Sequence, residues 1–236
     1  MAEARTLAVD IGGIGIKMLV LGPDGTRLTE HSRVSTPSPS TPQVVLERLR
    51  DEAVKHAPYD RIAIGFPGVV LHGVVKNAPN LGTEQWAGHD LQRSVEAALE
   101  CPTLVINDAD LQGYGVIAGQ GAEMVLTLGT GMGAALFTEG TLFPNLELGH
   151  HPFGDGNTYE ERISDAVLKD IGAEAWSTRV IETFEQLAPI FNYDTLHLGG
   201  GNVRHLTLPL PQGIRVFDNA EGLLGGLRLW ERATRS

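Results

Sequence analysis

Cysteine and long apolar runs are almost missing from this chain. Cys101 is the one cysteine among 236 residues, so no intramolecular disulfide can form, and the small secreted proteins built on several bridges are excluded. No apolar run approaches the roughly 20 residues that a membrane-spanning helix needs. The N-terminal segment Met1–Arg5 is too short and polar for a signal peptide. We therefore expect a cytoplasmic protein that is not inserted in a membrane.

Basic side chains are also scarce. Lysine and arginine number 18 against 29 aspartate and glutamate residues, which gives a formal net charge of −11. Duplex nucleic acid and anionic membranes both demand a basic surface, so neither is expected as the main partner. A polyanionic substrate would need a local basic patch. Because no Cys-x-x-Cys pair accompanies Cys101, we expect no structural zinc site.

The rest of the composition, 42% apolar and 20% charged residues, is that of an ordinary globular protein. Strand-like and helix-like patterns alternate along the chain, which predicts an α/β fold. The predicted strands cover 6–21 as a hairpin, 27–34, 61–66, 103–106 and 194–198. The predicted helices cover 42–56, a segment capped by Asp90, 159–171, 179–188 and about 220–233.

The strand–glycine turn–strand pattern of residues 9–15 recurs at 125–133. This repetition predicts two related lobes, and the length is sufficient for two small lobes around a cleft. We expect an N-terminal lobe over 1–106 and a C-terminal lobe over 107–236. The last helix is a candidate to pack back on the N-terminal lobe.

The two glycine turns are candidate phosphate sites. Asp10-Ile11-Gly12-Gly13 and Gly129-Thr130-Gly131 are of the sort that brings backbone N–H groups against phosphate. The Asp10 carboxylate could orient Mg²⁺ through water, and Lys17 could face a phosphate from the next strand. A plain hairpin turn and an exposed lysine are the alternative interpretations.

A third glycine segment, Gly199-Gly200-Gly201-Asn202, follows a predicted strand. It would let the backbone lie flat against an adenine or a ribose, and a flexible turn is the alternative. Asn107-Asp108 follows another strand. In open α/β sheets ligands gather beyond the carboxyl ends of strands, so Asp108 is a candidate base that accepts a hydroxyl proton during phosphoryl transfer. Its alternative role is the N-cap of a helix over 109–118.

Glu147 and His150 lie three residues apart between apolar anchors. A carboxylate and an imidazole at this spacing can grip adjacent hydroxyls of a sugar ring, and a solvated turn is the alternative. Glu160 could complete such a polyol site, although acidic residues in a first helical turn are also favoured by the helix dipole. The sequence leaves both alternatives open.

Taken in order, these motifs resemble the ROK (repressor/ORF/kinase) sugar kinases, and among them the polyphosphate glucokinase branch. The resemblance covers nearly the whole chain. It is carried by Asp10–Lys17, Gly65–Val70, Ala78–Leu81, Asn107–Asp110, Leu128–Gly131, Leu146–Phe153, Thr158–Glu161 and Leu198–Asn202.

The resemblance implies a two-lobed actin-like ATPase (ribonuclease H-like) fold with a central cleft, and a homodimer. It implies Asp108 as the base that deprotonates the 6-hydroxyl of glucose or a related hexose. The glycine turns would hold the donor phosphates with Mg²⁺. The implied substrate ligands are Asn80, Asn107, Glu147, His150 and Glu160.

The chain departs from the family pattern at several places. Ile14 stands where the first phosphate turn usually has serine or threonine. Phe153-Gly154-Asp155-Gly156-Asn157 replaces a stretch that is typically lysine-rich in the polyphosphate-using branch, which favours ATP. No helix-turn-helix precedes Asp10, so a DNA-binding repressor is disfavoured. We expect a glucose 6-kinase that uses polyphosphate or ATP, and the alternative is a sugar-binding or regulatory protein without phosphoryl transfer.

Overall fold

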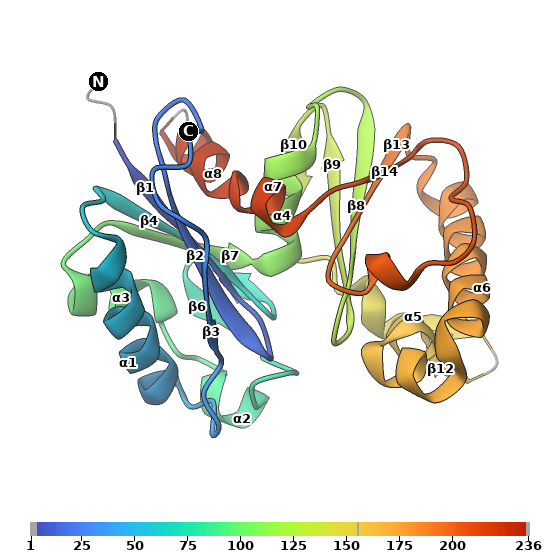
Figure 1. Cartoon of the computed structure of the whole chain (residues 1–236), viewed down its shortest axis with the longest axis horizontal. Helices are drawn as coiled ribbons and strands as arrows, with labels where there is room; N and C mark the ends of the chain where they lie inside the picture. Colours follow the sequence, from blue (N-terminus) through green and yellow to red (C-terminus); the bar gives the residue numbers. More distant parts are fainter. Residues whose placement is uncertain (1–3, 155, 235–236) are drawn as a thin grey trace. The chain divides into compact units, whose positions relative to one another are not determined.

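The computed structural model describes residues 4–154 and 156–234. The chain forms two compact units (Figure 1). Unit 1 consists of Met1–Gly115 and Ala220–Ser236, and unit 2 consists of Val116–Asn219. The chain therefore passes from unit 1 to unit 2 and returns once.

Unit 1 is built on a five-stranded sheet with the order β3-β2-β1-β4-β7. The first three strands pair antiparallel, and β4 and β7 add to β1 in parallel. A small hairpin of β5 and β6 lies outside this sheet. The strands are β1 (Thr6–Ile11), β2 (Gly15–Leu21), β3 (Ser32–Ser35), β4 (Arg61–Phe66), β5 (Val70–Leu71), β6 (Val74–Val75) and β7 (Thr103–Asn107).

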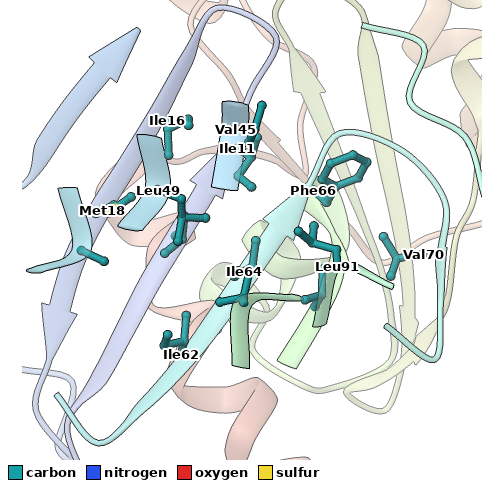
Figure 2. Packing of buried hydrophobic residues seen from close by; sticks show 14 of the residues in the cluster. Ile11, Ile16, Met18, Val45, Leu49, Ile62, Ile64, Phe66, Val70 and Leu91 are labelled. Atoms are coloured by element: carbon teal, nitrogen blue, oxygen red, sulfur yellow. The ribbon is translucent and has the colours of Figure 1, made fainter. Parts of the chain in front are cut away.

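Helices cover both faces of this sheet. α1 and α3 cover one face, where Ile11, Ile64 and Phe66 pack with Val45 of α1 and Leu91 of α3 (Figure 2). α7 and α8 cover the other face, over the buried side chains of β1 and β2. The helices of unit 1 are α1 (Pro42–Ala53), η1 (Val54–His56), α2 (Thr83–Trp86), α3 (Leu91–Leu99), α4 (Asp108–Val116), α7 (Asn219–Leu223) and α8 (Gly225–Ala233).

The strand predicted over 27–34 is wrong in its first half. Ladder pairing on β2 starts only at Ser32, after an isolated bridge between Leu21 and Arg27. The Thr29 side chain takes the place of a backbone partner, because its Oγ1 accepts a hydrogen bond from Val20 N at 3.0 Å. A side chain that bonds to the neighbouring backbone competes with the strand ladder in this way.

Unit 2 repeats the plan of a hairpin joined to parallel strands, with the sheet order β10-β9-β8-β13-β14. The hydrophobic core of this unit includes side chains of α6 and of β8, β9 and β13. The strands are β8 (Ala122–Leu128), β9 (Met132–Thr138), β10 (Thr141–Phe143), β11 (Pro152–Gly154), β12 (Asn157–Thr158), β13 (Thr195–Gly199) and β14 (Ile214–Val216). The helices are η2 (Leu148–His150), α5 (Tyr159–Ile163), α6 (Asp165–Phe191) and η3 (Val203–His205).

The helices predicted over 159–171 and 179–188 have other bounds in the structure. The first is interrupted at Ser164, which is extended with φ −63° and ψ 165°. α6 then continues to Phe191, across a kink at Gly172, where φ is 79°. The helical periodicity of the apolar residues continues on both sides of these breaks. The bounds predicted from that periodicity were therefore wrong at Ser164, at residues 172–178 and at the end of α6.

The division of the chain lies between Gly115 and Val116, whereas the sequence suggested 106/107. α4 belongs to unit 1 because its first turn rests on β4. A Cβ atom on Gly65 would lie 3.1 Å from the Asp108 Cα atom. The last helix, α8, also belongs to unit 1 and packs on β1 and β4. None of the helices in 4–154 and 156–234 is both long and apolar enough to cross a membrane.

Candidate functional site

The first glycine turn is closed by its own backbone and by a threonine. Gly12 N donates to Gly15 O at 2.9 Å, and Thr36 Oγ1 donates to Gly12 O at 2.6 Å. Asn80 lies against this turn, since a Cβ atom on Gly13 would be 3.2 Å from the Asn80 Cβ atom. The turn and Asn80, two separate sequence predictions, thus lie together in unit 1.

Asp10 and Lys17 form an ion pair beside this turn. They are register partners on β1 and β2, so their side chains share one face of the sheet. Lys17 Nζ lies 2.8 Å from Asp10 Oδ2, and the Asp10 side chain is only 7% exposed. The lysine therefore orients the carboxylate that the sequence predicts to approach Mg²⁺.

Asp108 begins α4 on the same face of the same sheet. Gly65 of β4 is the register partner of Asp10, and neighbouring strands lie about 4.8 Å apart. The backbone of Asp108 rests directly on Gly65, where any side chain would lie too close. The candidate base and the carboxylate of the first phosphate turn are therefore brought together within unit 1 by three adjacent elements.

Asn107 is the N-cap of α4. Asn107 Oδ1 accepts from Ala109 N at 2.8 Å and from Asp110 N at 3.1 Å, the pattern of an N-cap. Asn107 Nδ2 donates to Gly68 O at 3.2 Å. Asn107 is thus the N-cap, and Asp108 Oδ1 shares one of its donors by accepting from Ala109 N at 2.9 Å. Asn107 is buried, and its role as a hydroxyl ligand stays a prediction.

The second glycine turn, in unit 2, is joined to Glu160. Gly129 N donates to Gly131 O at 3.0 Å, and Glu160 Oε2 accepts from Met132 N at 3.1 Å. A Cβ atom on Gly131 would collide with Glu160 Oε2. The Glu160 carboxylate therefore occupies the space of a side chain at position 131 and would have to move if one were introduced.

The third glycine segment packs on the second turn. Asn202 Nδ2 donates to Gly129 O, and Asn202 N donates to Leu128 O, both at 3.0 Å. Gly200 has φ +94°, and a Cβ atom there would collide with the backbone of Leu128. The predicted phosphate turn and the predicted adenosine loop thus form one continuous surface of backbone in unit 2.

Glu147 precedes the short helix η2 and His150 is its last residue, with His150 Nε2 3.5 Å from Glu147 Oε2. Burial raises the pKa of Glu147, His150 opposes this rise, and the negative charge of Glu160 adds to it. The three predicted polyol ligands of unit 2 are therefore close enough to act on one another. A carboxylate and an imidazole that are half-buried side by side can accept and donate hydrogen bonds to adjacent hydroxyls.

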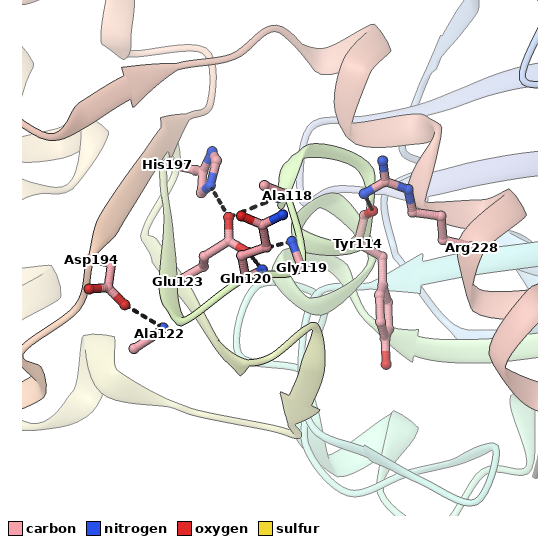
Figure 3. A network of polar contacts seen from close by, with 9 residues as sticks. All are labelled: Tyr114, Ala118, Gly119, Gln120, Ala122, Glu123, Asp194, His197 and Arg228. Carbon is pink, nitrogen blue, oxygen red and sulfur yellow. Dashed lines mark hydrogen bonds and ion pairs between the residues drawn. The ribbon is translucent and has the colours of Figure 1, made fainter.

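The sequence analysis missed a buried polar network at the start of unit 2 (Figure 3). Glu123 is 2% exposed and His197 is 3% exposed. Glu123 accepts hydrogen bonds from the backbone N–H groups of residues 118–120 and from His197 Nε2, at 2.6–3.2 Å. One signal could have revealed this network, namely a glutamate within the strand Ala122–Leu128, in which every other residue except Thr127 is apolar. In unit 1, Arg228 Nη1 donates to Tyr114 O at 2.9 Å (Figure 3).

The candidate residues fall into two half-sites, one in each unit. Asp155, in the segment that departs from the family pattern, lies outside the described residues. The half-site of unit 1 contains Asp10, Gly12, Gly13, Lys17, Asn80, Asn107 and Asp108. The half-site of unit 2 contains Gly129, Thr130, Gly131, Glu147, His150, Glu160, Gly199, Gly200, Gly201 and Asn202.

The donor set fits magnesium better than a metal that needs a complete protein cage. Among residues 4–154 and 156–234, no group of three or more His, Cys, Asp or Glu side chains could hold a metal ion. Mg²⁺ is commonly held by one or two carboxylates together with water and substrate phosphates. Asp10 beside the first glycine turn meets that requirement.

Comparison with known proteins gives a consistent result. The sequence model of the ROK family matches residues 6–158. The polyphosphate glucokinase of Mycobacterium tuberculosis (strain ATCC 25177 / H37Ra) is 33% identical over 242 residues, which cover 94% of this chain and 90% of that protein.

Solved structures share the fold of this chain. The crystal structure of inorganic polyphosphate/ATP-glucomannokinase from Arthrobacter sp. strain KM has a TM-score of 0.88 and 31% identity, covering 99% of this chain and 100% of that one. A ROK family glucokinase from Streptomyces griseus, in complex with glucose and AMPPNP, has a TM-score of 0.78 at 21% identity, covering 95% and 98% of the two chains. The two five-stranded mixed sheets and these matches confirm the predicted α/β class with the actin-like ATPase fold.

Proposed function

Because the chain belongs to the ROK family, we propose that it is a kinase that transfers a phosphoryl group from polyphosphate or ATP to the 6-hydroxyl of glucose or a related hexose. The observation that carries this proposal is the similarity to a polyphosphate glucokinase along nearly the whole chain, and hence along both half-sites. From the family resemblance we also propose a cytoplasmic homodimer.

In this proposal Asp108 is the general base. A sugar hydroxyl is a poor nucleophile, and a carboxylate within hydrogen-bond reach can accept its proton as the phosphoryl group is transferred. The location of Asp108 on the sheet face that carries Asp10 supports this role, because the base and the donor phosphates have to approach one another. Asn107 fixes the first turn of α4 and so orients the neighbouring carboxylate.

The polyol ligands Glu147, His150 and Glu160 would hold the hydroxyls of the hexose, with Asn80 and Asn107 contributing from unit 1. Holding the acceptor in one orientation lowers the entropic cost of the transfer. Exclusion of water around the bound sugar would prevent loss of the phosphoryl group to hydrolysis.

The glycine turns would bind the donor phosphates through backbone N–H groups. Asp10 would hold Mg²⁺ through water, and the ion would neutralise charge on the donor oxygens. Ile14, 63% exposed at the tip of the first turn, supplies no hydroxyl there. The remaining donor contacts therefore come from the backbone and from basic side chains nearby.

A steady-state assay that pairs glucose with each donor tests the proposed function. Purified, folded protein with Mg²⁺ is expected to form glucose 6-phosphate from polyphosphate, from ATP or from both. If no product forms with either donor, and glucose still raises the Tm while the donors do not, the chain is a sugar-binding protein and the kinase assignment is wrong.

Gly131→Ala is expected to lower kcat/KM for glucose by at least about tenfold. The new methyl group would displace the Glu160 carboxylate and break its bond to Met132 N, and a small misplacement of a binding group can cost about 10²-fold in rate. Gly129→Ala is the matched comparison, since its methyl group would meet no atom within 4 Å. Steady-state kinetics of both variants measure the difference, and equal losses would contradict the role given to Glu160.

A further inference from the structure

The chain is strongly acidic, yet several basic side chains gather beside the first glycine turn. Arg33 is the register partner of Lys17 across β2 and β3, so both side chains lie on the face that carries Asp10. A Cβ atom on Gly15 would be 2.9 Å from Arg33 Nε. The Arg33 side chain therefore reaches back over the end of the turn, where glycine leaves room for it.

Two further basic residues continue this row away from the turn. Arg27 forms an isolated bridge with Leu21 of β2, and Leu21 is on the same face as Lys17 because residues two or four apart on a strand point the same way. His31 lies two residues before Arg33, at a spacing of about 6.6 Å along an extended chain. Arg27, His31 and Arg33 are all exposed.

The charges of this row act on one another. Burial lowers the pKa of His31, and the positive charges of Lys17, Arg27 and Arg33 lower it further, while Asp10 opposes them. Asp10 is already paired with Lys17. Arg27 and Arg33 have no carboxylate within ion-pair distance in the part of the chain that the structure describes. Arg33 lies beside the phosphate turn and Arg27 lies at the far end of β2, and two such unneutralised guanidinium groups on one face are an unusual feature of a protein with a net charge of −11.

We propose that Arg33 and Arg27, with the His31 ring between them as a hydrogen-bond donor, form a cationic track for the polyphosphate chain beyond the phosphoryl group that is transferred. The proposal rests on the proposed kinase function. It explains how this chain could bind a linear polyanion although it lacks the lysine-rich stretch of its branch. Arginine suits this role because its planar donors bind phosphate oxygens in pairs. A nucleotide, with only three phosphates, would occupy the turn and leave most of the track empty.

The test is the double variant Arg27→Gln/Arg33→Gln, compared with Arg48→Gln/Arg50→Gln. The control removes the same charge from exposed positions on α1, a helix that covers the opposite face of the sheet. We expect the KM for long-chain polyphosphate to rise about tenfold in the track variant and less than about twofold in the control. The KM for ATP should rise by a clearly smaller factor. The salt dependence of polyphosphate binding should also become shallower, by about one unit of log–log slope per cation removed.

Binding of fluorescent long-chain polyphosphate without sugar, followed by anisotropy, separates this inference from the kinase proposal. If the wild-type protein transfers no phosphate but binds polyphosphate through Arg27 and Arg33, the kinase proposal is wrong and the track stands. If the KM for polyphosphate rises equally in the track variant and in the control, the track does not exist. The same conclusion follows if the track variant raises the KM for ATP and the KM for polyphosphate by the same factor.

Discussion

Replacing Asp108 by asparagine is expected to lower kcat for glucose phosphorylation by about 10²- to 10⁴-fold, the usual contribution of a positioned general base. The amide has nearly the same shape but cannot accept the proton of the sugar hydroxyl. Because the base acts mainly in the transition state, glucose binding should change little. Steady-state kinetics give kcat, and calorimetry of glucose binding gives Kd.

The matched control for this prediction is Asp60→Asn. It makes the same chemical change in the same unit, at an exposed carboxylate that pairs with Arg5, and such a surface pair contributes about 0–1 kcal/mol to stability. Thermal unfolding of both variants shows whether folding is intact. A variant at position 108 that keeps wild-type kcat, or one that loses glucose affinity but not turnover, would remove Asp108 from the role of base.

The places of Asp10 and Asp108 in the fold of unit 1 could be predicted from local sequence. A hairpin with glycines in its turn sets the position of Asp10, and an apolar strand that ends in Asn107-Asp108 sets the carboxyl end of β7. Both features depend on residues close in sequence. The sequence could not show which of Asn107 and Asp108 is the N-cap of α4. Either side chain can cap a helix, and the backbone conformation at the end of β7 decides which one does.

The predictions failed where contacts distant in sequence decide the outcome. Local pattern extended a strand through residues 27–31, but Thr29 bonds to the backbone of β2 instead. The basic row was not recognised because Arg27 and Arg33 join Lys17 only through the register of β2 and β3. Glu123 and His197 are 74 residues apart in sequence, and neither residue type predicts a buried partner. The apolar periodicity of a segment predicts which face of its element a residue occupies. Strand pairing and other contacts distant in sequence decide which residues it contacts on that face.

Glu123→Gln is expected to destabilise the protein by about 3 kcal/mol or more. The buried carboxylate accepts three backbone N–H groups and the His197 ring. An amide presents its own N–H groups to some of these donors, and removal of one charged partner from a buried pair typically costs about 3–5 kcal/mol. For a chain of this size the Tm should fall by roughly 6–12 °C. Glu139→Gln, at an exposed glutamate of the same unit, is the control and should leave the Tm nearly unchanged.

The pH dependence of the stability lost in Glu123→Gln distinguishes an effect of the Glu123 charge from an effect of packing. Burial alone would raise the pKa of Glu123, but the hydrogen bonds from Ala118, His197, Gly119 and Gln120 outweigh burial and lower that pKa. A carboxyl group with a lowered pKa in the folded state contributes stability above its unfolded pKa of about 4.3, and this contribution is lost as the pH falls through the folded value. The gap in unfolding free energy between wild type and Glu123→Gln should therefore be constant near neutral pH and narrow below about pH 4. If this difference in unfolding free energy stayed the same below about pH 4, the packing of the Glu123 side chain, and not its charge, would hold residues 118–120 at the start of unit 2.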